Sequence, residues 1–184
     1  DTPAGKYEFY GYVHYKDGTR LGDRKGDMPQ FDPGVLTENG KVYLYTGFCG
    51  NHMKDRIGAM ATVLDASDML TIIEEPVVIA PGDHYSSAFD DKGNVVTPIE
   101  TDCTYPLVST QNWCGFKDHE FFEAPSIRKI GDTYYFVFSS AVMHELCYAT
   151  SKSPTKDFVY KGVIVSNCDL HIDSYKPADM PAAY

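Results

Sequence analysis

Two acidic residues occupy equivalent places in an internal repeat and could share the work of breaking one bond. Asp32 lies in Phe31-Asp32-Pro33-Gly34, and Glu123 lies in Phe122-Glu123-Ala124-Pro125, 91 residues later. One carboxyl group can protonate a departing oxygen while a second carboxylate assists, as in glycoside hydrolysis. Either acid alone would also suit a turn, because Asp-Pro commonly opens turns. Their matched positions favour a shared chemical role.

Aromatic and histidine residues near the two acids are candidate substrate ligands. An aromatic ring packs against the C–H face of a sugar, and an imidazole can hydrogen-bond to its hydroxyl groups. The candidates are Phe31, Trp113, His119, Phe122 and His144. Blade packing remains an alternative for the two phenylalanines, as do a solvated loop for His119 and a structural role for His144.

The segments that must position these residues have the composition of short β-strands. Aromatic and β-branched residues dominate 41–48, 133–138 and 158–165, and helical periodicity is nowhere sustained. Glycine-containing turns such as Glu38-Asn39-Gly40 separate the strands. The predicted fold class is therefore all-β.

A unit of four strands occurs twice, which is typical of β-propeller blades. The first strand of a blade lines the central channel, so the repeat predicts that Asp32 and Glu123 face the same space. The predicted divisions are an outer strand of a preceding blade over 1–15, a blade over 30–80, an active-site insertion over 81–121, a blade over 122–166 and a linker to a further blade over 167–184.

Charge and composition exclude several classes of partner. The 184 residues carry a formal net charge of -10 without a basic stripe, which disfavours nucleic acids and anionic membranes. No apolar run approaches the roughly 20 residues that a spanning helix needs. Zinc is disfavoured because the histidines are not spaced around the five cysteines as ligand pairs. The unpaired cysteines favour a cytoplasmic location over a secreted one.

The motifs resemble glycoside hydrolase family 43 along essentially the whole chain. Gln30-Phe-Asp-Pro-Gly-Val35 is similar to the family segment whose aspartate assists the acid. His119-Glu-Phe-Phe-Glu-Ala-Pro-Ser-Ile-Arg-Lys129 is similar to the segment that bears the general acid, and Tyr148-Ala-Thr-Ser-Lys-Ser-Pro154 to a recurring outer-strand entry. The resemblance implies a partial five-bladed β-propeller, with about two complete blades and an outer strand of a preceding one.

The resemblance also implies an activity. Family members are inverting glycosidases that remove terminal pentoses or related sugars from plant cell-wall polysaccharides. Glu123 would be the general acid and Asp32 its assistant, while the family's general base lies upstream of anything matched here. No cofactor is required, with a calcium ion in the channel of the complete propeller as a further option. The alternatives are a non-catalytic carbohydrate-binding propeller and an inactive structural fragment.

Residues 1–184 produced alone should be inactive and should associate. A closed propeller needs at least about four blades, so two blades leave strand edges that the other blades or another chain would cover. Sedimentation should therefore show self-association or heterogeneity. A monodisperse monomer that unfolds cooperatively would contradict this expectation.

Overall fold

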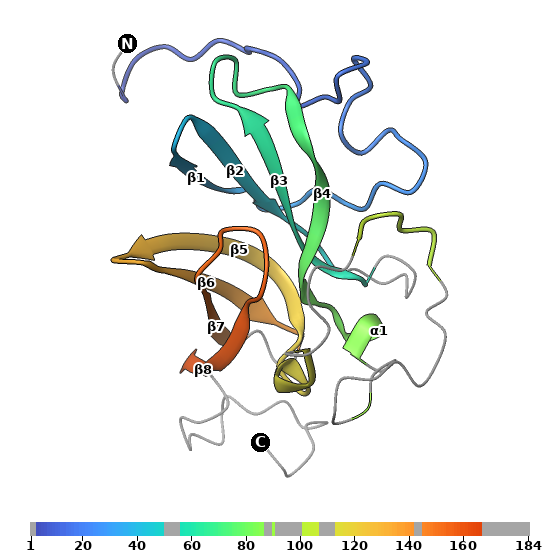
Figure 1. Ribbon diagram of the computed structural model, residues 1–184, viewed down its shortest axis with the longest axis vertical. Coiled ribbons are helices and arrows are strands. Elements are labelled where there is room, and N and C mark those ends of the chain that lie inside the picture. The colour runs from blue at the N-terminus through green and yellow to red at the C-terminus, as the bar shows by residue number, and fades with distance from the viewer. Residues whose placement is uncertain are drawn as a thin grey trace.

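The computed structural model describes residues 3–49, 56–86, 90, 101–106, 113–141 and 145–166. Its strands form two four-stranded antiparallel sheets, in the orders β1-β2-β3-β4 and β5-β6-β7-β8. One sheet lies against the other, as Figure 1 shows. The strands are β1 Gly34–Glu38, β2 Lys41–Thr46, β3 Gly58–Asp65, β4 Ile72–Pro81, β5 Phe121–Ile130, β6 Thr133–Ser140, β7 Leu146–Ser151 and β8 Val159–Val165.

Two-residue hairpins join the first two strands of each sheet. Asn39 and Gly40 both have positive φ, which is the backbone of a type I′ turn, and Glu38 pairs with Lys41 across it. Gly131 alone has positive φ in the second hairpin, as a type II′ turn requires. A two-residue hairpin therefore sets the register between the first two strands of each sheet.

The main core lies between the two sheets. Side chains on β6 alternate in burial, and Phe136 and Phe138 point from that strand into the core. Phe136 packs against Tyr45 of β2 at a ring-centroid distance of 6.2 Å and against Phe158 at 5.6 Å. Aromatic packing thus joins the first sheet to the second.

Strand β3 is buried on both faces, as its almost wholly buried pattern shows. Ala59, Ala61 and Val63 face the second sheet, whereas Met60 packs into a separate cluster with residues from outside the sheets. That cluster also contains Met28, Ile57, Val78, Tyr105 and Trp113. The N-terminal segment and the insertion therefore cover the outer face of the first sheet.

The buried carboxylate of Asp27 holds the N-terminal segment and the insertion against the outer face of the first sheet. The side chain of Asp27 is fully buried and accepts hydrogen bonds from the hydroxyl groups of Tyr15 at 2.6 Å and Tyr105 at 3.0 Å. Arg24 pairs with the same carboxylate and lies over the Tyr15 ring. Because a buried charge without partners is costly, this network fixes the path of the N-terminal segment.

Short helices occupy part of the insertion. Helix α1 spans Asp83–Ser86 and the 3-10 helix η2 spans Trp113–Phe116. No helix in the described part of the chain is long and apolar enough to cross a membrane. The expected all-β character is therefore confirmed.

The outer strand expected over 1–15 is not tested by the described residues of the N-terminal segment. Between residues 3 and 33 the structure has only isolated bridges, from His14 to Thr71 and to Arg20. Tyr7, Phe9 and Tyr10 are largely exposed. The strands that this segment would pair with in a preceding blade are not part of the chain, so the assignment stays a prediction. The proposed linker over 167–184 lies outside the described residues.

Replacing Phe136 with alanine should destabilise the full-length protein by about 3 to 5 kcal/mol, because the ring contributes to both sheets and its loss leaves a cavity. Chemical denaturation should report the loss. Ile130→Ala is the control: Ile130 is 65% exposed on the hairpin, so its cost should stay within about 0.5 kcal/mol. Equal costs would contradict the assigned core.

Candidate active site

The first strands of the two sheets, β1 and β5, lie side by side with repeat-equivalent residues aligned. A Cβ atom on Gly34 would collide with the carbonyl oxygen of Pro125, so the backbones are in close contact there. At the other end of the strands, Lys129 pairs with Glu38. Both contacts join residues 91 positions apart. Asp32 and Glu123 have the same separation, so they stand at the same end of the two strands.

The backbone is strained just before β1 and near the start of β5. Asp32 has a φ of 48° and is followed by Pro33, while Ala124 has a φ of 57° and is followed by Pro125. A residue before proline normally takes an extended conformation, and a side chain with positive φ is unfavourable. Such strain persists only where packing imposes it, and it is common at functional sites. It also explains why β1 begins only at Gly34, after Pro33.

Glu123 lies between two register shifts in the pairing of β5 with β6. One shift falls between Phe121 and Glu123, and the next between Glu123 and Ser126. Bulges of this kind re-aim a side chain and are frequent beside active sites. Glu123 is half-buried and Asp32 is exposed. The two shifts therefore leave the carboxyl group of Glu123 outside the regular alternation of the strand.

Phe48 joins the two strand entrances. Its ring centroid lies 5.1 Å from that of Phe31 and 5.6 Å from that of Phe122. The backbone N–H of Cys49 donates to the carbonyl of Phe122 at 2.9 Å, and that of Gly47 donates to the carbonyl of Phe31 at 3.3 Å. The end of β2 thus brings together the two segments that carry the acids. Phe31 remains 50% exposed, which leaves its ring accessible to a ligand.

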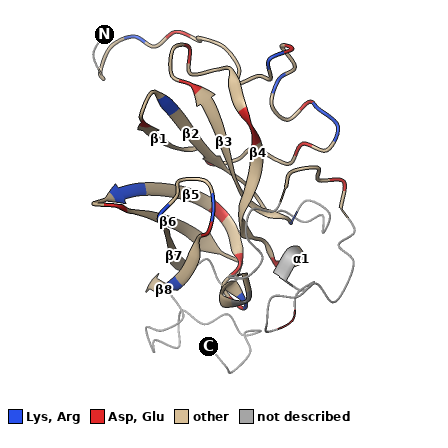
Figure 2. Ribbon diagram, in the orientation of Figure 1, with Lys and Arg blue, Asp and Glu red and all other residues tan. Residues whose placement is uncertain are grey.

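Basic and acidic residues separate along β5, as Figure 2 shows. Arg128 and Lys129 mark its far end, and Glu123 lies near its start. With Asp32 beside this start, the described structure gathers two carboxylates and two aromatic rings at one end of the inner strands. The carboxyl groups can donate a proton, and the aromatic rings can bind the apolar face of a sugar.

Two of the predicted substrate ligands need a different account. Trp113 is only 1% exposed and packs among Met28, Met60 and Tyr105, so it presents little surface to a sugar in this arrangement, and its stacking role stays a prediction. An indole of this size is buried because the apolar cover of the first sheet needs its volume. His144 lies outside the described residues.

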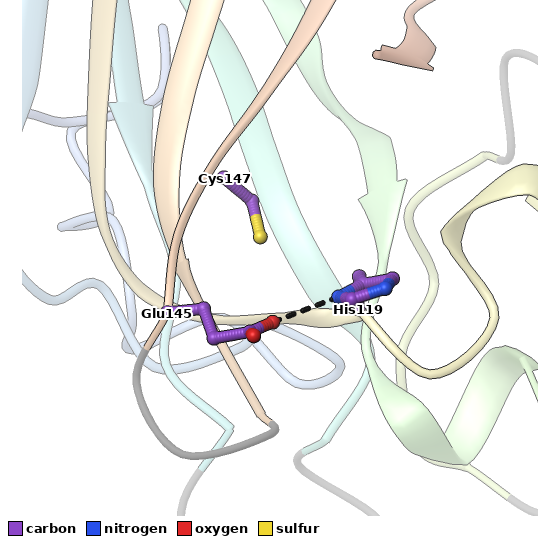
Figure 3. Close-up of side chains that lie close together, drawn as sticks. All are labelled: His119, Glu145 and Cys147. Atoms are coloured by element: carbon purple, nitrogen blue, oxygen red, sulfur yellow. Dashed lines mark hydrogen bonds and ion pairs between the residues drawn. The ribbon is translucent and has the colours of Figure 1, made fainter. Parts of the chain in front are cut away.

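His119 belongs to a cluster that the sequence analysis missed (Figure 3). Its Nδ1 lies 2.8 Å from a carboxylate oxygen of Glu145, and its ring stacks on Tyr160 at 5.1 Å. Cys147 lies beside them: its sulfur and the donor atoms of the other two residues are all within 4.8 Å of one another. Glu145 lies just before β7 and Cys147 lies in it two residues later, so their side chains share a face, whereas His119 comes from a different segment.

The chain is similar to known proteins in both sequence and structure. It is 64% identical over all 184 residues to a xylosidase/arabinosidase of Thermoclostridium stercorarium, and 30% identical over 101 residues to a xylosidase/arabinosidase of Bacteroides ovatus. A solved glycoside hydrolase family 43 β-xylosidase/α-arabinofuranosidase from a compost metagenome matches with a TM-score of 0.50 and 25% identity. The expected resemblance to glycoside hydrolase family 43 is thereby confirmed.

The two four-stranded antiparallel sheets and the similarity to the solved family 43 enzyme confirm the predicted partial propeller, in which each sheet is a blade. The chain spans 33% of the Thermoclostridium relative and 24% of the Bacteroides relative. It covers 42% of the solved family 43 chain, with 74% of its own residues matched. No family model matches the chain.

The contact between the inner strands should depend on pH. Hydrogen bonds from Lys129 and Tyr134 lower the pKa of Glu38 below its usual value. The pair therefore stabilises the blade contact above the ordinary glutamate pKa and is lost as the pH falls through the lowered value. Glu38→Gln should reduce stability at neutral pH, and the difference from the wild type should shrink below about pH 4. Unfolding midpoints measured from pH 7 to pH 2 would test this, and a constant difference would contradict it.

Proposed function

We propose that the protein containing this chain hydrolyses terminal pentose or related sugars of plant cell-wall polysaccharides with inversion at the anomeric carbon. Glu123 acts as general acid and Asp32 assists it. The observation that carries the proposal is the alignment of β1 and β5, which brings Asp32 and Glu123 to one end of neighbouring strands. The family 43 relatives, named xylosidase/arabinosidase, support the choice of substrate.

In the proposed reaction, the carboxyl group of Glu123 transfers its proton to the departing glycosidic oxygen as the bond to the anomeric carbon breaks. A water molecule attacks the opposite face of the sugar and loses its proton to a general base. That base belongs to a part of the protein outside this chain. Asp32 assists from the same end of the neighbouring strand.

Substrate binding in this proposal uses the aromatic rings at the strand entrances. Phe31 offers an exposed ring, and Phe122 is held beside it through Phe48. Stacking of a sugar face on Phe31 would orient the glycosidic oxygen toward β5. The solved family 43 structure contains xylotriose, which supports an oligosaccharide as the ligand. Further blades would complete the pocket and choose the sugar.

A calcium ion in the channel of the complete propeller is part of this proposal. It is supported by the related enzyme whose solved structure is described as a calcium-free form. Calcium takes oxygen ligands, so the imidazole and thiol of the His119 cluster do not suit it. Its ligands would come from other parts of the protein. A cytoplasmic location is likewise proposed, supported by the buried free thiols of Cys49 and Cys147.

The role of Glu123 can be tested by its dependence on the leaving group. In the full-length protein, Glu123→Gln should lower kcat by about 10²- to 10⁴-fold on substrates with poor leaving groups, which need protonation. Activated aryl glycosides need little protonation and should lose far less. Steady-state kinetics on both substrate classes would measure the difference. Asp32→Asn should lower kcat and shift the pH profile.

Glu38→Gln is the matched control, because Glu38 lies at the opposite end of the same pair of strands. It should keep its kcat on both substrate classes at neutral pH. Equal losses on good and poor leaving groups for Glu123→Gln would remove it as proton donor. Wild-type protein that binds xylo-oligosaccharides without cleaving them would instead show a carbohydrate-binding propeller.

A further inference from the structure

Three side chains with different donor atoms meet where β5 begins and β7 begins (Figure 3). His119 stands two residues before β5, Glu145 just before β7, and Cys147 in β7. Their nitrogen, oxygen and sulfur donors lie within 4.8 Å of one another. The Cys147 side chain is fully buried and Glu145 is nearly so. The proposed hydrolysis uses neither Glu145 nor Cys147.

We propose that His119, Glu145 and Cys147 form a binding site for a zinc ion. Imidazole, carboxylate and thiolate are the three ligand types that zinc takes in proteins, usually in tetrahedral geometry. A sulfur and a nitrogen among the donors exclude magnesium and calcium as good occupants. The site is distinct from the two carboxylates proposed for catalysis, although His119 lies four residues before Glu123.

Zinc binding requires the three donors, which lie within 4.8 Å of one another, to adjust their spacing. Bonds of about 2.0 Å to nitrogen and oxygen and 2.3 Å to sulfur place tetrahedral ligands about 3.3 to 3.6 Å apart. His119 and Glu145 are closer than this, at 2.8 Å, because they share a hydrogen bond. An entering ion would replace that proton, and the two groups would separate by about half an ångström.

A hydrogen-bond partner for the sulfur and a route for the ion are present. The hydroxyl of Tyr160 forms a hydrogen bond of 3.8 Å with the sulfur of Cys147, and burial raises the pKa of that phenol, so Tyr160 supports the sulfur as a neutral partner. The His119 side chain is 30% exposed, so the ion can enter from its side. Stacking on Tyr160 holds the imidazole ring toward Glu145.

Burial argues against a role for Cys147 as a free reactive thiol. The sulfur is out of contact with solvent, and burial raises the pKa of the thiol. A redox or nucleophilic cysteine is instead exposed, with a lowered pKa. Zinc binds this cysteine in spite of the raised pKa, because the ion binds the thiolate and releases the proton to solvent.

The bound ion would connect two segments of the second blade. One is the approach to β5, which leads to Glu123, and the other is the start of β7. The backbone already connects them through the end of β6, because the N–H of Ala141 donates to the carbonyl of Glu120 at 2.7 Å and the N–H of Ser140 donates to the carbonyl of Glu145 at 2.9 Å. Zinc would add a second link at the same end of the blade and hold the acid-bearing segment in place.

The test is metal binding by the full-length protein. After dialysis, elemental analysis should find about one zinc ion per chain bound at this site, and X-ray absorption should show one sulfur neighbour at about 2.3 Å. Replacement of zinc by cobalt should produce a thiolate-to-cobalt absorption band. Cys147→Ser should abolish that band and the bound metal, and Glu145→Gln should weaken metal retention.

Cys49→Ser is the matched control, since Cys49 is another fully buried thiol that lies outside the cluster. It should keep the metal and the absorption band. Wild-type protein without zinc and without a cobalt band would overturn the proposal, as would equal retention by Cys147→Ser. If Cys147→Ser fails to fold, the presence or absence of a sulfur neighbour in the X-ray absorption spectrum of the wild-type protein still tests the proposal. None of these measurements depends on hydrolytic activity.

Discussion

Aromatic packing between the two sheets is the interaction on which the rest of the structure depends. Phe136 contacts rings from both sheets, and Phe121 and Phe138 extend the same cluster. These rings bury apolar surface that neither sheet could bury alone, since each sheet has one strongly apolar face. With that packing in place, β1 and β5 come so close that position 34 accepts only glycine without a shift of the backbone.

The close approach of β1 and β5 has a consequence at their entrances. A positive-φ residue in front of a proline stands just before β1, at Asp32, and near the start of β5, at Ala124. Both entrances are linked to the segment after β2 through Phe48 and the backbone of residues 47 and 49. The unfavourable conformations are held by this packing and by the hydrogen bonds. The alignment of β1 with β5 brings Asp32 and Glu123 to one end of the inner strands, because the contacts between these strands join residues 91 positions apart.

At the same end of the second blade, polar side chains pack together. A nearly buried carboxylate, Glu145, is matched by a histidine from another segment, and a buried thiol lies beside the pair. A carboxylate in such a place needs a partner, because removal from water is costly for a charge. The region that leads to Glu123 is thus held by polar contacts as well as by the aromatic core.

Much of this structure could be predicted from strand and turn preferences of neighbouring residues. Alternating aromatic and β-branched residues marked the strands, Asn39-Gly40 and Gly131 marked the hairpins, and the repeat at 91 residues marked two equivalent blades with an acid at the same place in each. These features could be predicted because strand and turn preferences act between neighbours in the chain. The motifs also indicated the family.

Other features were decided only by tertiary structure. Trp113 seemed suited to a sugar platform, yet the outer face of the first sheet buries it. His119 is 26 residues from Glu145, and no local sequence pattern predicts their contact. The start of β1 at Gly34 likewise follows from the strain at Asp32 and Pro33. Sequence determined the elements and their repetition, whereas burial and long-range partners were decided by packing, because these depend on which distant surfaces come together.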